Sequence, residues 1–195
     1  MNNNYNTYLV VIIIIGIVLK FFFNSEFYQL QCITSPLDSN TYCVRDRKNK
    51  KKTVNLLSTI TMKMKKMVKL MEKYYGEQEN VKRLVENFNP TRIKETIPSS
   101  SLVAYSENKG EKMAFCVTKK KNGSKFIDEN TLTFVAIHEL AHIMTHSIGH
   151  TPEFWDNFKL LLEHAVEFKI YHPINYNDKN IEYCGMTIKD NPLFD

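Results

Sequence analysis

The first apolar stretch of the chain runs from Tyr8 to Phe23 and contains a single charged residue, Lys20. Its 16 residues are fewer than the roughly 20 that usually cross a bilayer, but Lys20 lies near one end, where its stem can reach the interface. The run predicts a transmembrane anchor over 8–23, preceded by a tail of residues 1–7. A cleaved signal peptide is the alternative, although the bulky residues FFFNSEF offer no small-residue cleavage site and no basic residue precedes the run.

The next pattern along the chain is helical. Apolar residues recur at steps of three and four, at Leu57, Ile60, Met64, Met67, Val68, Met71 and Tyr75. This spacing predicts an amphipathic helix over 53–75, which Gly76 can end. Lysines occupy the other face, so we interpret the methionine stripe as core packing rather than as a soft-metal site.

A shorter helix is predicted over 81–88, where Asn89-Pro90 stops it. The pattern then changes to that of β-strands. The runs 102–106 and 113–117 are rich in β-forming residues, and the link between them carries Gly110. These features predict an antiparallel hairpin whose edge strand can pair with an extended peptide.

Residues 24–52 show neither period and are predicted to form an irregular basic tether before a folded domain over 53–195. Six basic residues and one acidic residue lie between Arg45 and Lys52, so this cluster alone matches the net charge of +5 of the whole chain. By the positive-inside rule the cluster places the domain on the cytoplasmic side, where it can contact anionic lipid head groups. Nucleic acid is an alternative partner that no other feature supports.

A third helix, which Asp128 or Asn130 can cap, carries the candidate chemistry. It contains His138 and His142, which are four residues apart and therefore project from one face of the helix. In this HExxH pattern the two histidines can chelate one zinc ion. Glu139 follows His138 directly, so its carboxylate can reach a water on that metal and act as the general base of a hydrolytic reaction.

Catalytic zinc usually takes three protein ligands and leaves a fourth position for water. Two histidines follow the motif, His146 and His150. Gly149 suits a helix end, and Thr151-Pro152 is typical of the cap and first position of a new helix, so His150 lies in a turn that can bend back toward the metal. His146, one turn further along a continuing helix, would have to lean back along the axis. We therefore predict His150 as the third ligand.

The helix that begins at Pro152 is predicted to bury the apolar side chains of Trp155, Phe158, Leu162, Ala165 and Val166. His164 and His172 are interpreted as structural, because the first lies on the outer part of that helix and the second precedes Pro173 in a loop. A tyrosine hydroxyl can serve as an oxyanion donor, but the sequence does not choose among Tyr171, Tyr176 and Tyr183.

The four cysteines form no CxxC pair and match no cysteine-based zinc module. They are Cys32, Cys43, Cys116 and Cys184, and we predict that none binds metal. Cys32 and Cys43 can form a local disulfide in an oxidising lumen, whereas all four are ordinary thiols in a reducing compartment. The sequence leaves both possibilities open.

The motif HELAH followed by GHTPEFW resembles the WLM and SprT-like zinc metallopeptidases, in which a helical HExxH precedes a third histidine ligand and an aromatic-rich helix. The resemblance implies that His138 and His142 are the helical ligands, that Glu139 is the catalytic glutamate and that His150 is the third ligand. It also implies a compact zincin-like fold with a hairpin beside the active-site helix.

This resemblance covers roughly residues 53–188 and is strong over 131–168. The segments AYSENKG and EYCGM on either side of the motif are similar to an uncharacterised WLM-like set encoded by large DNA viruses. One departure is the spacing of the third ligand: seven residues separate His142 from His150, where the WLM pattern usually has five.

The predicted fold is therefore an α+β, zincin-like domain with an active-site helix and an edge hairpin, preceded by one N-terminal transmembrane helix. The predicted function is that of a membrane-anchored zinc metallopeptidase that acts on protein or peptide substrates and meets membrane lipid through 8–23. The alternatives are a structural zinc site closed by His146 as a fourth ligand, and zinc-dependent hydrolysis of a non-peptide substrate. Some proteins of this kind cleave DNA-linked proteins, but a membrane anchor argues against transferring that role.

Overall fold

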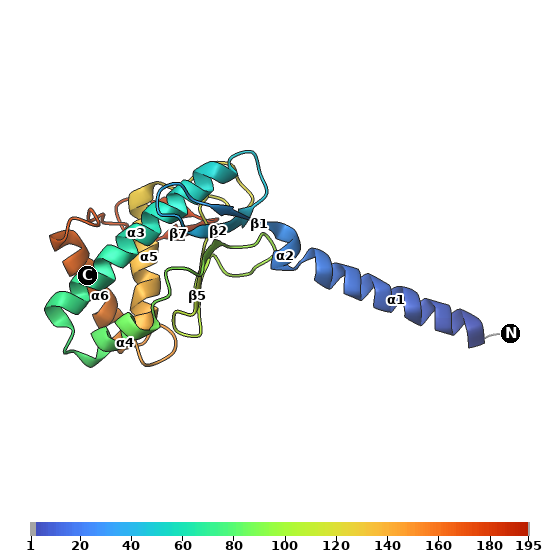
Figure 1. Ribbon diagram of the computed structural model, residues 1–195, viewed down its shortest axis with the longest axis horizontal. Coiled ribbons are helices and arrows are strands. Elements are labelled where there is room, and N and C mark those ends of the chain that lie inside the picture. The colour runs from blue at the N-terminus through green and yellow to red at the C-terminus, as the bar shows by residue number, and fades with distance from the viewer. Residues whose placement is uncertain (1–2, 195) are drawn as a thin grey trace.

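The computed structural model describes residues 3–194, in which a long helix projects from a folded domain (Figure 1). This helix, α1, spans Asn3–Phe23 and has 21 residues, which gives a length of about 30 Å. It therefore begins earlier than the predicted anchor and includes most of the predicted tail. Its segment Tyr5–Phe23 is long and apolar enough to cross a membrane and has no part buried in the domain, although a signal sequence would share these properties.

Residues 24–52 include a short helix and two strands of the main sheet, so the prediction of an irregular tether was wrong. A short helix, α2 (Glu26–Gln29), leads into strands β1 (Leu30–Thr34) and β2 (Thr41–Arg45), which pair antiparallel. Tyr42 and Val44 of β2 are fully buried in the core. Two apolar residues in a five-residue strand give too weak an alternation to stand out in the sequence, because most of the strand's stabilisation comes from its neighbours.

The sheet has five strands in the order β1-β2-β3-β5-β4. The short β3 (Ile93–Glu95) runs parallel to both β2 and β5. The predicted hairpin is confirmed as β4 (Ala104–Glu107) and β5 (Lys112–Phe115), and β4 forms one edge of the sheet. Gly110 in its turn has a φ of 117°, and a Cβ atom there would meet the Asn87 carbonyl oxygen at 2.5 Å, so this position requires glycine.

The predicted helices are confirmed, with small changes at their ends. They are α3 (Lys50–Tyr75), α4 (Glu79–Asn87), α5 (Glu129–Met144) and α6 (Pro152–Glu167). The apolar stripe of α3 is buried at Leu57, Ile60, Met64, Met67, Val68 and Met71. Each such side chain contributes roughly 2 kcal/mol by leaving water, so the stripe fixes α3 against the domain. The helix α5 packs against α3, α4 and α6 and is the central helix of the domain.

The C-terminal tail folds back onto the domain as a second hairpin, β6 (Ile181–Tyr183) and β7 (Met186–Ile188). Backbone hydrogen bonds from Cys184 and Gly185 join its turn to the segment that follows β5. All four cysteines form disulfides, Cys32–Cys43 across β1 and β2 and Cys116–Cys184 between the main sheet and the tail. The disulfides leave no cysteine of residues 3–194 free for a metal.

Candidate metal centre

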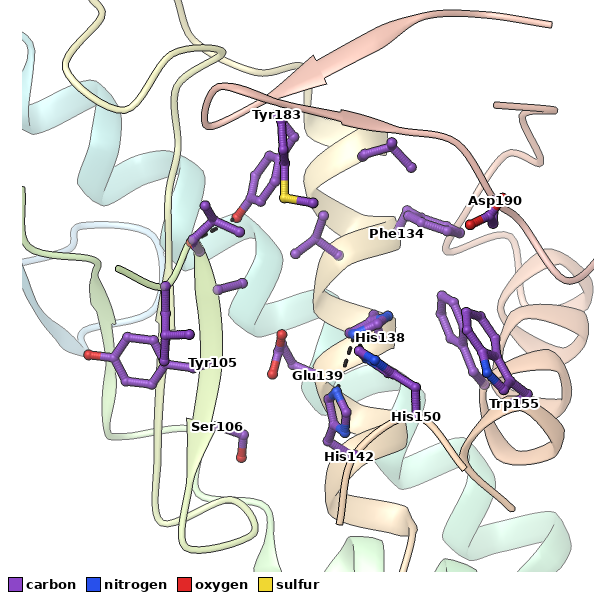
Figure 2. A pocket seen from close by; sticks show the side chains of 18 of the residues that line it. Tyr105, Ser106, Phe134, His138, Glu139, His142, His150, Trp155, Tyr183 and Asp190 are labelled. Carbon is purple, nitrogen blue, oxygen red and sulfur yellow. Dashed lines mark hydrogen bonds between the residues drawn. The ribbon is translucent and has the colours of Figure 1, made fainter. Parts of the chain in front are cut away.

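The helix α5 carries two of the predicted metal ligands, His138 and His142, and the predicted general base, Glu139. Its first turn is capped by Asp128, whose carboxylate accepts a hydrogen bond from the Thr131 amide at 2.8 Å. Beyond the cap, apolar side chains on several sides of the helix are buried, and they include Leu132, Ile137, Leu140, Ala141 and Ile143. The imidazoles of His138 and His142 project from the remaining face into a cleft, where both rings lie beside that of His150 (Figure 2).

The three predicted ligands lie together, although they come from two different segments. The Nε2 atom of His138 is 3.2 Å from Nε2 of His142 and 3.1 Å from Nε2 of His150. Two nitrogens that bind one tetrahedral zinc at about 2.05 Å are about 3.3 Å apart, so this spacing fits a shared metal ion. The three form the cluster of possible metal ligands found among the described residues.

The protonation state of the histidines also suits metal binding. Burial, together with the neighbouring His142 and His150, lowers the pKa of His138 to about 3. Burial and His150 similarly lower the pKa of His142 to about 4. Both rings are therefore neutral at pH 7, so each has a nitrogen lone pair available for a cation.

Glu139 lies beside His138 on the wall of the same cleft (Figure 2). Its side chain is buried, and this burial raises the pKa of the carboxyl to about 8. A carboxyl with such a pKa can both take up and release a proton near neutral pH. A positive charge placed between the three histidines would favour the ionised form of Glu139 and so lower its pKa again.

The segment between the motif and α6 differs from the prediction in one respect. The helix α5 ends at Met144, with Thr145 as its C-cap, and does not continue toward Gly149. Gly149 does take the predicted positive φ, at 86°, and Thr151 caps α6 as expected. His146 therefore lies beyond the helix, where its side chain is exposed.

Residues 145–150 form the loop that carries His150, and charged side chains outside the loop hold its backbone. The ammonium group of Lys109, in the turn between β4 and β5, donates hydrogen bonds to the carbonyl oxygens of Thr145 at 2.8 Å and Ser147 at 2.6 Å. The Glu153 carboxylate on α6 accepts hydrogen bonds from the backbone amides of His146 at 2.7 Å and Ser147 at 3.0 Å.

Two further side chains complete these contacts. Arg83 on α4 donates to the Met144 carbonyl at 2.7 Å, and Asn157 on α6 donates to the Thr145 hydroxyl at 3.0 Å. We call the four residues Arg83, Lys109, Glu153 and Asn157 the loop clasp. Sequence analysis did not identify any of them, because they come from three separate elements and have no common spacing.

The three candidate metal ligands line a cleft of about 1040 Å³. Strand β4 forms one wall, and α6, β7 and the segment after β7 contribute to the other. Four of its lining residues are exposed and apolar, namely Leu102, Ile148, Trp155 and Met186. The predicted burial of Trp155 was wrong: its side chain is 38% exposed, and the neighbouring Phe154 is buried in its place, with its ring 4.3 Å from that of His142.

Of the three tyrosines considered as oxyanion donors, Tyr183 lines the cleft. Its hydroxyl group donates a hydrogen bond to the Val103 carbonyl at 3.4 Å, and burial raises its pKa, so it stays a hydrogen-bond donor. Tyr171 and Tyr176 are buried and pack their rings against Phe134 in the core.

The histidines interpreted as structural lie outside the three-histidine cluster. His164 forms a hydrogen bond of 2.9 Å with Glu167 and contacts the ring of Tyr75, whereas the backbone amide of His172 donates to Asn130. Both arrangements agree with the structural interpretation.

No protein-family model matches the chain. An uncharacterised protein of Acanthamoeba polyphaga mimivirus, R325, is 29% identical over 201 residues, which cover 96% of this chain and 99% of that protein. Uncharacterised protein 136R of Invertebrate iridescent virus 6 is 40% identical over 70 residues, or 35% of this chain and 38% of that protein. These proteins confirm the predicted similarity to uncharacterised proteins of large DNA viruses.

Among solved structures, Wss1 from Saccharomyces cerevisiae has a similar fold. Its TM-score is 0.50 at 19% identity, and the alignment covers 65% of this chain and 87% of the Wss1 chain. Wss1 is a WLM-domain zinc metalloprotease, so the resemblance drawn from the motif is confirmed at the level of the fold. The mixed α+β architecture is confirmed in the same way.

Proposed function

We propose that this chain is a zinc-dependent peptidase that α1 anchors in a membrane. One observation carries the proposal: three histidine Nε2 atoms converge beside a buried glutamate in a large cleft, and one wall of that cleft is the edge strand of the sheet. The fold shared with Wss1 also supports the proposal of a zinc-dependent peptidase.

In this proposal His138, His142 and His150 hold one zinc ion. Bound there, zinc supplies Lewis-acid polarisation of the scissile carbonyl and lowers the pKa of a water molecule. The Glu139 carboxylate takes a proton from the attacking water and passes it to the leaving amine, so the same residue acts as base and then as acid. The buried surroundings of Glu139 keep its carboxyl away from bulk water, which would otherwise compete for the proton.

A peptide substrate fits the cleft because of β4. This strand pairs with β5 and is the last strand at its end of the sheet, so it is an edge strand. An extended peptide can add to that edge as a further strand, which would bring its backbone past the three histidines. The exposed apolar residues Leu102 and Met186 along the cleft favour substrates with apolar side chains.

Two alternatives remain distinct from this proposal. A structural zinc site would need a fourth protein ligand, and His146 lies outside the cluster of Nε2 atoms, with its amide committed to Glu153. A site with three histidine ligands and an open fourth position favours a catalytic zinc over a structural one. Hydrolysis of a non-peptide substrate uses the same chemical groups, and the edge strand β4 is the feature that favours a peptide instead.

The test compares Glu139→Gln with the wild type, both as the full chain in detergent micelles. Zinc content should stay at one ion per chain, because the ligands are unchanged, while cleavage of a peptide library should fall by about a thousandfold with the loss of the base. The exposed Glu163 on α6 provides a matched control, Glu163→Gln, which should keep full activity. Wild-type turnover by Glu139→Gln would contradict the mechanism, and a zinc-free wild type would contradict the site.

For topology, we propose that α1 is a single-pass anchor with the domain on the cytoplasmic side, as the basic residues after it favour. The two disulfides argue in the opposite direction, because they are typical of an oxidising lumen. The exposed sequon at Asn122 distinguishes these orientations, since it can receive a glycan only in the lumen. We expect the protein to resist carbonate extraction and to carry no glycan. A glycan that is present on the wild type and missing from the Asn122→Gln variant would show that the domain lies in the lumen.

A further inference from the structure

The positive charge of this protein is concentrated in two segments, 45–52 and 119–125. Together they contain ten of the 26 basic residues and a single acidic residue, Asp46. The other parts of the chain hold 16 basic and 20 acidic residues, so they are slightly negative. The whole positive excess therefore belongs to these two segments, which lie about 70 residues apart in the sequence.

The fold brings the two segments side by side. The Arg45 guanidinium donates a hydrogen bond to the Lys121 carbonyl. The ring of Phe126, directly after the second segment, lies 4.7 Å from the Lys52 ammonium and 5.6 Å from the Arg47 guanidinium, measured to its centroid. We call the resulting surface the basic face; it consists of Arg47, Lys48, Lys51, Lys52, Lys119, Lys120, Lys121 and Lys125.

Few carboxylates neutralise this face. The buried Glu95 pairs with Arg45 and Arg47, and Asp46 pairs with Lys50. Among the side chains that the structure describes, no carboxylate forms an ion pair with the exposed lysines of the face, which are Lys48, Lys51, Lys52, Lys120 and Lys125. Their charge is available to an external anion.

The start of α3 adds to this positive potential. Its first turn holds three lysines and no acidic residue, and Asn49 makes no capping hydrogen bond with its side chain. Lysines at this end of a helix repel the positive end of the helix dipole, which destabilises the helix unless negative charge lies nearby. A surface of anions in front of this turn would remove the repulsion.

The basic face lies close to the end of α1. Arg45 is paired with Leu30 in the β1–β2 hairpin, and Leu30 is only seven residues beyond Phe23, the last residue of α1. The Lys50 ammonium donates to the Gln31 side chain at 2.6 Å. The hairpin thus returns the chain to the end of the apolar helix, and Figure 1 shows the N-terminal end of α3 on the side of the domain that faces β1 and α2.

We propose that the basic face rests on the anionic head groups of the membrane into which α1 inserts. The helix α1 then holds this face against the phosphate groups. The chain would contact the membrane at two places, through α1 in the bilayer and through the basic face on the head groups. Each basic residue near an anionic surface strengthens its binding by roughly fivefold, so several together suffice to fix the orientation of the domain. This contact would determine which way the cleft opens relative to the membrane, whatever reaction takes place there.

The test uses the full chain in nanodiscs, either zwitterionic or with about a third anionic phospholipid. Acetylation of each lysine is followed by mass spectrometry. We expect Lys48 and Lys119 to react about fivefold more slowly in the anionic nanodiscs, and this protection to disappear at high salt. The exposed lysines Lys65 and Lys159, on α3 and α6 away from the face, should react equally in both.

Two sets of substitutions separate a local contact from an effect of net charge. Changing Lys51, Lys52, Lys120 and Lys125 to Gln should abolish the protection of Lys48 and Lys119. The matched control changes Lys65, Lys69, Lys159 and Lys179 to Gln, which removes as much charge elsewhere and should leave the protection intact. Equal reactivity in both kinds of nanodisc would overturn the proposal, as would protection by a DNA or RNA duplex without protection by anionic lipid.

Discussion

The candidate metal centre takes its ligands from two regions that are built in different ways. His138 and His142 lie on α5, whose packing against three other helices fixes both imidazoles. His150 is exposed and lies in the loop 145–150, which depends on hydrogen bonds from the loop clasp. The first pair can be displaced only by disrupting the core, whereas His150 can move when single polar contacts are lost. The loop is thus the part of the centre at which metal affinity can change without unfolding.

The largest effect on zinc affinity should come from removing the ligand that the loop supplies. A four-ligand zinc site binds with about 10–16 kcal/mol, or roughly 3 kcal/mol per ligand, so His150→Ala should weaken zinc binding by about a hundredfold. Cleavage should fall in parallel. His146→Ala should change zinc affinity by less than about twofold, since only the backbone amide of His146 takes part in a contact of the loop.

Competition with a chelator measures both affinities on the full chain, and His142→Ala gives the reference for a ligand on the helix. If the two regions contribute equally to the metal, His142→Ala and His150→Ala lose similar affinity. A larger loss for His146→Ala than for His150→Ala would mean that the third ligand has been assigned wrongly.

A smaller effect is expected from Lys109, which contacts the loop without being a ligand. Its ammonium binds the carbonyls of Thr145 and Ser147, so Lys109→Met leaves those acceptors without a donor and frees the loop. Substitutions of residues that orient metal ligands typically cost ten- to a hundredfold in affinity, and we expect about tenfold here because three other clasp residues remain. The melting temperature of the metal-free protein should change little.

Lys112 is a suitable control, because it lies in the same hairpin and its ammonium contacts Glu107 at 3.5 Å instead of the loop. Lys112→Met should leave zinc affinity unchanged. Equal losses in the two variants would show that the hairpin as a whole, rather than the Lys109 ammonium, positions His150. The absence of any loss in Lys109→Met would show that the loop does not need this contact.

The same contrast explains how far the sequence could predict the structure. The helices and the hairpin beside the centre follow from periodicity, and His138, Glu139 and His142 follow from the spacing of one helix turn. The turn at Gly149 was also predicted, because glycine and the Thr151-Pro152 cap are local signals. Each of these features depends on residues that are neighbours in the sequence.

What the sequence did not reveal depends on contacts between distant segments. Strands β1, β2 and β3 have three to five residues each and become stable only as members of one sheet. Cys116 and Cys184 are 68 residues apart, and no spacing rule pairs them. The loop clasp joins Arg83 and Lys109 to a loop about 40 to 60 residues downstream. Trp155 was misplaced because it neighbours the buried face of α6 but belongs to the cleft.

The smallest expected effect concerns Glu153, the acidic member of the loop clasp. Hydrogen bonds from the His146 amide and from the Ser147 hydroxyl and amide lower the pKa of its carboxyl to about 2. A lowered pKa means that the carboxylate stabilises the loop fully above the ordinary value near 4.5, and that this contribution is lost only as the pH falls through about 2.

In the metal-free protein, carbon NMR of the Glu153 carboxyl should therefore give a titration midpoint near 2, and Ser147→Ala should raise that midpoint by removing one donor. At pH 7, Glu153→Gln keeps an acceptor oxygen but loses the charge. It should weaken zinc binding by about fivefold or less, the equivalent of one hydrogen bond of about 1 kcal/mol. Glu163→Gln on the exposed face of α6 is the control and should have no effect. A midpoint near 4.5 would mean that the carboxylate does not hold the loop in solution, and the position of His150 would then rest on Lys109, Arg83 and Asn157 alone.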